Sequence, residues 1–390
     1  MSERADAVVG RALVACVTGR PDDAIDRVVA GGLLPDLIAA ARYHRVLNLV
    51  HLALEGRTDL DVTLAAGLKR YYLHQIGHHL RAVEDLAGLD EAFAARGIPW
   101  LIVKGPVLSE VVYERPDLRE YHDLDVVIPR ETYPQAIEAL RSAGAELLDR
   151  NWELIRREGR AQLHVSLRLG TVADVHHHLL NRAAVRHSFA MPIEEMLERA
   201  RLVSVGGLTV RTLDPVDTLL HLCIHAGLAG GHRLIWLKDV ERSVAREAPS
   251  WTELIARARS YRAGPLVAVT LSRARDALGC DVPADVIRSL FASRLRRWLT
   301  AVTGRIWPVE RAGTRPTPAV IWAQAVRDTW SGTVAAATSR VMRPILRKSG
   351  PLDEEEWTHP SEADAASAAT SHEGPEDYLK RIAGSDRTGD

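Results

Sequence analysis

The chain has 390 residues, of which 46% are hydrophobic and 26% are charged, as is typical of a soluble globular protein of two or three domains. Fifty basic residues against fifty-one acidic ones leave no overall positive charge, which argues against a nucleic acid as partner. The charged start MSERADAVVG and the lack of an apolar run of about 18 residues predict no signal peptide and no membrane span.

Three cysteines, Cys16, Cys223 and Cys280, are odd in number and far apart in the sequence. This pattern argues against a disulfide framework and against a cysteine-based zinc site. It favours a reducing compartment, and we therefore expect a cytoplasmic protein.

The first 97 residues carry the periodicity of helices. Apolar residues recur at three- and four-residue intervals over 34–54, and the segment 64–96 predicts one long helix that ends at Gly97. We assign residues 1–97 to an N-terminal helical region.

Strands and helices alternate between residues 98 and 213. The stretch WLIVKG at 100–105 predicts a strand and a tight turn, followed by a helix with Pro106 at its first position. LDVVIP at 124–129 predicts a second strand, and 130–144 a helix ended by glycine. Further strands are expected at 145–149, 160–167 and 171–179, and a hairpin that turns at 205–208.

Helices resume at Asp214 and continue to about residue 350, and residues 351–390 predict a mostly disordered acidic tail with a short helix near Tyr378. The expected fold class is therefore α+β. A small mixed-sheet unit, 98–213, is flanked by helical regions at 1–97 and 214–350.

Two aspartates, Asp123 and Asp125, lie at the start of the second predicted strand. Residues two apart on a strand project from the same face, so their like charges lie close together. That arrangement is unfavourable unless a cation lies between them. A charged strand edge that discourages aggregation is the alternative explanation. A later strand brings Asp174, with His176 on the same face.

These residues have complementary uses if the ligand is a nucleoside triphosphate with magnesium. Paired carboxylates hold hard cations that bridge phosphate oxygens. A helix that begins after Gly105 directs amide N–H groups at phosphates. Lys104 and Arg119 can neutralise the charge of a transferring phosphoryl group. A lysine whose ammonium simply reaches solvent at the strand end is the alternative for Lys104.

In these motifs the sequence resembles the nucleotidyltransferase superfamily that includes DNA polymerase beta. More narrowly, it is similar to a largely uncharacterised bacterial nucleotidyltransferase family. The resemblance covers roughly residues 30–245, and the stretches that carry it are ARYHRVLNLV, LIVKGPVLSEVVY, Arg119, HDLDVVI, ADVHHHL and LDPVDTLLHLCIHAG…HRLIWLKDV.

The resemblance implies that Asp123, Asp125 and Asp174 are catalytic and bind magnesium, in a site for two metal ions. It also implies nucleotide contacts for Lys104, Gly105 and Arg119. His176 is expected beside the metal ligands or on the substrate side.

The implied reaction transfers a nucleoside monophosphate from an NTP, expected to be ATP, to a hydroxyl-bearing acceptor, with release of pyrophosphate. The acceptor can be a small molecule, a peptide or a protein.

Three other hypotheses stay open at the level of sequence. Pro106 follows Gly105 where the wider superfamily carries Gly or Ser, which supports a nucleotide-binding scaffold without turnover. A metal-dependent hydrolase would use Asp174, His176 and a second group at Asp217, His221 and His225, which share one helical face. A toxin–antitoxin component that acts on a partner protein is the third.

Overall fold

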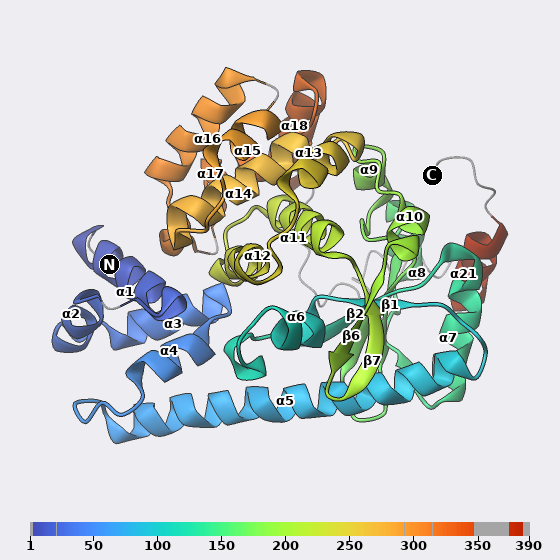
Figure 1. The fold of residues 1–390 in the computed structure, drawn as a ribbon, viewed down its shortest axis with the longest axis horizontal. Coiled ribbons are helices and arrows are strands. Elements are labelled where there is room, and N and C mark those ends of the chain that lie inside the picture. Colours follow the sequence, from blue (N-terminus) through green and yellow to red (C-terminus); the bar gives the residue numbers. More distant parts are fainter. Residues whose placement is uncertain (1–2, 21, 292, 314, 347–373, 385–390) are drawn as a thin grey trace. The chain divides into compact units, whose positions relative to one another are not determined.

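The computed structural model describes residues 3–20, 22–291, 293–313, 315–346 and 374–384. The chain forms two compact units, each assembled from segments that are not consecutive in sequence. Figure 1 labels the helices and strands that these units contain. The first unit comprises Met1–Gly77, Val112–Glu120 and Pro215–Arg343, and the second comprises His78–Val111, Tyr121–Asp214 and Pro344–Asp390. The division into four consecutive parts expected from the sequence stays a prediction.

The first unit is helical. Its elements are α1 (Glu3–Thr18), α2 (Ala24–Ala30), α3 (Leu34–His44), α4 (Leu47–Leu54), the start of α5 (Val62–Ala94), η1 (Pro116–Leu118), α11 (Pro215–Ala229), α12 (Leu234–Glu247), α13 (Trp251–Ser260), α14 (Gly264–Leu278), α15 (Ala284–Leu290), α16 (Arg294–Ile306), η3 (Val309–Arg311), α17 (Pro318–Ala325) and most of α18 (Trp330–Leu346). Within the described ranges, no helix combines the length and the apolar composition needed to cross a membrane.

The helical periodicity over 34–54 is interrupted in the structure. Arg45 has φ 55°, a left-handed conformation, and the amide of Val46 donates to the carbonyl of Ala41 at 2.9 Å. This closing turn ends α3 and lets α4 begin at Leu47, so that one apolar pattern serves two helices.

A histidine at the end of α3 is fully buried. The Nδ1 atom of His44 accepts a hydrogen bond from the amide of Leu234 at 3.2 Å. Burial, reinforced by the nearby His232 and Arg233, lowers the pKa of His44 from 6.5 to about 3. The folded protein therefore holds this ring neutral.

We expect acid to destabilise the first unit through His44. Above pH 6.5 the ring is neutral in both states, whereas between pH 6.5 and about 3 only the unfolded chain binds the proton, so stability falls as the pH drops. His44→Asn keeps an acceptor for Leu234 and removes the titration. Chemical unfolding at pH 7.5 and pH 5 should show a smaller loss for the variant than for the wild type, and equal losses would contradict the assignment.

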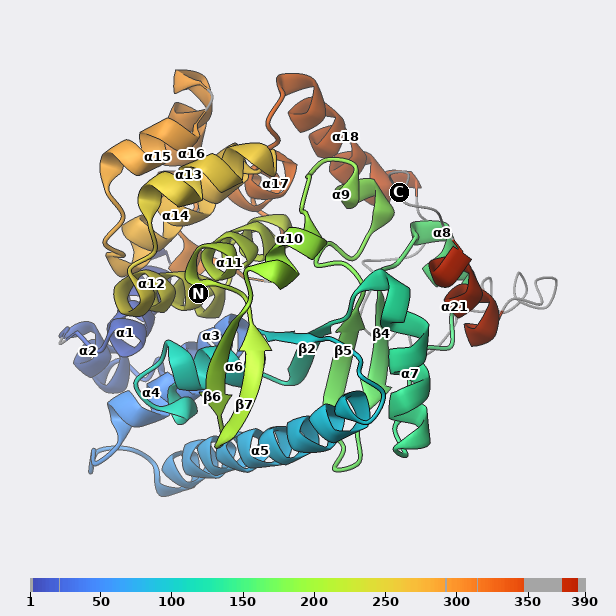
Figure 2. The ribbon, with the colours of Figure 1, turned by 45° about the vertical axis from the view of Figure 1, so that its right-hand side comes forward.

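The second unit is built on a five-stranded mixed sheet in the order β1-β2-β5-β4-β3. Figure 2 labels its three middle strands, β2, β5 and β4. Strand β2 pairs with β5 in parallel, and the other neighbours are antiparallel. The strands are β1 (Leu101–Val103), β2 (Asp123–Val127), β3 (Glu146–Leu147), β4 (Gln162–Ser166) and β5 (Val172–His176). The α+β fold with a small mixed sheet is as the sequence predicts.

The remaining elements of this unit surround the sheet. They are the rest of α5, α6 (Gly105–Val111), η2 (Arg130–Thr132), α7 (Tyr133–Ser142), α8 (Trp152–Glu158), α9 (Ala183–Arg186), α10 (Ile193–Glu198), α21 (Pro375–Gly384) and the hairpin β6 (Arg201–Val205) and β7 (Leu208–Thr212). At the expected hairpin turn, Gly206 has φ 57° and a Cβ atom there would lie 2.1 Å from Val83, so only glycine fits.

One face of the sheet is apolar and forms the core of the unit. Side chains from α5 and α7 pack on alternate strand residues, among them Leu124, Val126, Leu163, Val165, Ala173 and Val175. Because neighbouring residues on a strand face opposite ways, this packing leaves the intervening polar residues on the other face.

Part of the predicted acidic tail belongs to this core. Most of residues 351–390 lie outside the described residues, but Pro375–Gly384 form α21, where the sequence predicts a short helix near Tyr378. Tyr378, Leu379 and Ile382 are buried, and the Tyr378 hydroxyl donates to the carbonyl of Arg160 at 2.9 Å.

A buried carboxylate on α5 holds the turn between β4 and β5. Asp85 accepts hydrogen bonds from the amides of Leu169 and Thr171 at 2.8 and 3.1 Å. If an amide replaced the carboxylate, one of these two N–H donors would face an NH2 group and lose its acceptor.

Asp85→Asn should therefore lower the free energy of unfolding by about 1–3 kcal/mol, measured with urea. The neighbouring Glu84 pairs with Arg168 at 3.6 Å at the surface, so Glu84→Gln should cost less than about 1 kcal/mol. Equal effects of the two changes would show that the turn does not depend on Asp85.

Candidate active site

The polar face of the sheet begins at the turn after β1. Lys104 and Gly105 both have left-handed φ angles, 52° and 43°. A Cβ atom on Gly105 would lie 3.2 Å from the backbone oxygen of Asp123, so glycine lets the turn approach the start of β2. The turn places Lys104 Nζ 2.9 Å from Asp125 Oδ1.

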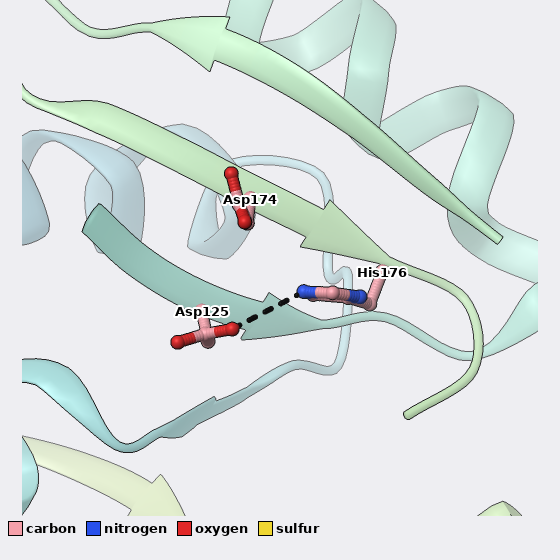
Figure 3. Close-up of side chains that lie close together, drawn as sticks. All are labelled: Asp125, Asp174 and His176. Carbon is pink, nitrogen blue, oxygen red and sulfur yellow. Dashed lines mark ion pairs between the residues drawn. The ribbon is translucent and has the colours of Figure 1, made fainter. Parts of the chain in front are cut away.

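Asp125 and Asp174 lie directly opposite each other on the parallel strands β2 and β5. His176 follows on the same face of β5, and its Nε2 atom is 3.3 Å from Asp125 Oδ1 (Figure 3). One ligand atom from each of these three residues lies within 4.8 Å of the others. His176 is buried, and its other ring nitrogen, Nδ1, has no hydrogen-bond partner.

We call Asp125, Asp174 and His176, together with the adjacent Lys104 and Asp123, the cluster. It carries more negative than positive charge. Burial acts to raise the pKa of Asp125, but the Lys104 ammonium and the His176 ring outweigh it and hold that pKa well below its usual range. Burial and the charges of Asp123 and Asp125 raise the pKa of Asp174 well above its ordinary value. Lys104 thus neutralises one carboxylate and leaves the other with an unfavourable charge.

These residues fit a divalent cation. Two carboxylates supply the oxygen ligands that magnesium and manganese prefer, and the imidazole of His176 offers a buried nitrogen without another partner. A cation held by the group would remove the repulsion between Asp125 and Asp174.

The structure distributes the other expected site residues differently. Asp123 lies on the same face of β2, two residues before Asp125, and its charge acts on Asp174 and Lys104. Arg119 belongs to the first unit, where its Nε and Nη2 atoms bind the Asp239 carboxylate at 2.8 and 2.9 Å. The pair is buried, and a nucleotide contact of Arg119 stays a prediction.

Three further residues reach this site that were not predicted from the sequence: Asp149, Gln162 and His164. Gln162 and His164 on β4 pair with His176 and Asp174 on β5. Asp149 follows β3 and binds His164. The alternation of polar and apolar residues in QLHVS indicates a strand with one polar face. Only the register of β4 on β5 shows that this face lies beside Asp174.

His164 joins Asp149 to the cluster. Its Nδ1 atom lies 2.9 Å from Asp149 Oδ1, and its Nε2 atom lies 3.0 Å from Gln162 Nε2 and 3.8 Å from Asp174 Oδ1. Burial alone would lower the pKa of His164, but the hydrogen bond to Asp149 and the charges of Asp149 and Asp174 raise it to about 8. The neutral ring accepts from Gln162 at Nε2, and the protonated ring faces Asp174 as a donor.

Residues 34–279, well over half of the chain, match a protein family described as "Uncharacterised nucleotidyltransferase". The chain belongs to this family. Curated proteins contain no sequence match to the chain. A solved structure titled "Solution Structure of Antibiotic-Resistance Factor ANT(2'')-Ia Reveals Substrate-Regulated Conformation Dynamics" is similar to 43% of this chain, over 84% of its own length, with 13% identity and a TM-score of 0.30.

The alternative metal site, at Asp217, His221 and His225, has another explanation in this member of the family. Asp217 is fully buried and its carboxylate binds the hydroxyl of Tyr261 at 2.9 Å and the guanidinium of Arg257 at 3.0 Å. The three residues do not form a group with metal-ligand geometry in the described part of the chain. Asp217 thus links α11 to α13 and to Tyr261 just after it, and the ring of His225 packs edge-on against Trp236 of α12.

Replacing Lys104 should destabilise the protein, because Lys104 supplies the positive charge that pairs with Asp125. Lys104→Met leaves Asp125 buried without its ammonium partner, which should lower the free energy of unfolding by about 3–5 kcal/mol in metal-free buffer. Manganese should then raise the melting temperature of the variant more than that of the wild type.

The matched control is Arg168→Met, which removes a surface partner of Glu84 and should cost less than about 1 kcal/mol with no change in the response to manganese. A Lys104→Met protein as stable as the wild type without metal would contradict the assigned role of the lysine.

Proposed function

We propose that this protein is a magnesium-dependent nucleotidyltransferase that moves a nucleoside monophosphate from an NTP to the hydroxyl group of an acceptor and releases pyrophosphate. The observation that carries the proposal is the register of β2 on β5, which sets Asp125 opposite Asp174 with His176 beside them. The cluster lies inside the residues matched by the family.

In this proposal Asp125 and Asp174 would hold one cation, and Asp123 would help to hold a second. Cations held there would stabilise the charge on the phosphoryl oxygens as Lewis acids. Lys104 and the turn at Gly105 contact the triphosphate, with the ammonium neutralising phosphate charge.

Proton and bond changes follow from this placement. The acceptor oxygen attacks the α-phosphorus in line with the leaving group and loses its proton to the carboxylate of Asp174. The bond from the α-phosphorus to the oxygen bridging it to the β-phosphate breaks, and pyrophosphate leaves with that oxygen.

We propose ATP as the nucleotide, and a small molecule, a peptide or a protein as the acceptor. The balance of fifty basic and fifty-one acidic residues supports an acceptor other than RNA. A cytoplasmic location is supported by Cys16, Cys223 and Cys280, which are all buried free thiols.

The test is release of pyrophosphate from each of the four NTPs with magnesium, with a cell extract as the pool of acceptors. Asp125→Asn should reduce release more than about 100-fold, because it removes a carboxylate ligand and not only a supporting group. Glu84→Gln, at the surface of the same unit, should leave the rate unchanged. Full activity of Asp125→Asn would overturn the proposal.

The main alternative is a nucleotide-binding protein without turnover, in line with Pro106 after Gly105. It predicts that Mg-ATP raises the melting temperature of the wild type but not of Asp125→Asn, with no pyrophosphate from any NTP. If the carboxylates only discourage aggregation at a strand edge, Mg-ATP should not raise the melting temperature and no pyrophosphate should be released.

A further inference from the structure

We propose that Asp149, His164 and Gln162 act together as positioning residues for the Asp174 carboxylate, and that metal affinity at the cluster depends on them. This inference rests on the proposed function and adds residues to the same site. The buried Asp149 carboxylate binds the His164 ring, and the ring contacts the Gln162 amide. That amide donates to Asp174, which faces Asp125 and His176.

Asp149 is the fixed end of the set. Its side chain is 1% exposed, and both oxygens bind the same residue, Oδ2 the amide of His164 at 2.6 Å and Oδ1 the ring Nδ1 at 2.9 Å. The preceding amide, that of Leu148, donates to the carbonyl of His164 at 2.9 Å, which extends the pairing of β3 with β4. In either protonation state of the ring, Nδ1 carries the hydrogen that Asp149 accepts, so the ring plane is fixed.

Gln162 is held in one orientation of its amide. Its Oε1 atom accepts from Asn181 Nδ2 at 2.7 Å, and Asn181 Oδ1 in turn accepts from the amide of Ala161 at 3.1 Å. The Gln162 NH2 group must therefore point the other way, toward Asp174 Oδ2 at 2.5 Å and the ring of His164.

The two nitrogens of His164 and Gln162 face the two oxygens of Asp174. They are 3.0 Å apart, with Gln162 at 2.5 Å from Oδ2 and His164 at 3.8 Å from Oδ1. Asp125 lies opposite Asp174 on the other side, and repulsion between the two side chains would turn the Asp174 carboxylate away. The nitrogens of Gln162 and His164 hold that carboxylate in one orientation toward Asp125 and His176, as partners of metal ligands do.

Packing alone does not require these polar residues. On the opposite face of β4, Leu163 and Val165 fill the core with apolar side chains, which need no partner. Buried polar groups contribute to stability only when every member is satisfied, and replacing such a set with apolar side chains often costs nothing. The set therefore points to a function at Asp174.

The experiment measures manganese binding to the full chain by electron paramagnetic resonance, with magnesium-dependent pyrophosphate release as a second readout. Gln162→Met keeps the length of the side chain and removes its donors, and Asp149→Asn removes the charge behind His164. Each should weaken manganese binding about 10- to 100-fold and raise the half-saturating magnesium concentration by a similar factor.

Asp85→Asn is the matched control, because Asp85 is another buried carboxylate of the same unit that accepts two hydrogen bonds from backbone amides. It should lose stability with unchanged manganese affinity. If Asp149→Asn fails to fold, Gln162→Met still decides the question.

Wild-type manganese affinity in folded Gln162→Met would overturn the positioning role and leave the proposed function intact. A wild-type protein that binds no manganese and releases no pyrophosphate would overturn the proposed function, and this inference with it.

Discussion

Two carboxylates that face each other across β2 and β5 set the constraint on which the polar face of the sheet depends. Parallel pairing puts Asp125 and Asp174 at the same height of the sheet, and burial strengthens their repulsion. Such a pair persists only with a compensating cation or a set of fixed donors. Lys104 supplies a cation on one side, and Gln162 with His164 supplies donors on the other.

One face of the sheet forms the apolar core that stabilises the unit, and the other face carries the polar residues of the candidate site. Burial of apolar side chains against α5 and α7 fixes the strands and their register. That register then brings polar residues from β2, β4 and β5 together on the opposite face without any of them being close in sequence. The arrangement explains why a unit with a small sheet also includes α21 from the far end of the chain, since Tyr378 and its neighbours complete the same core.

The family match extends well beyond the sheet. Residues 34–279 include segments of both compact units, so helices such as α3, α4, α11 and α12 belong to the matched region as much as the strands do. In the first unit, Arg119 and Tyr113 both bind Asp239, which ties the segment between α6 and β2 to α12. The chain between Gly105 and Asp123 is long because it contributes to both units.

The sequence by itself determined the local elements and the residues with metal-binding chemistry. Periodicity, glycine and proline predict the strands, the hairpin at Gly206 and the helix around Tyr378, because these signals act over a few residues. The spacing of Asp123 and Asp125 places them on one face for the same reason. Only the tertiary structure decided which partners they meet. Strand order and register are set by the packing of the whole core, so they assigned Arg119 to Asp239, gathered His176 with Asp125 and Asp174, and brought Asp149, His164 and Gln162 to the site.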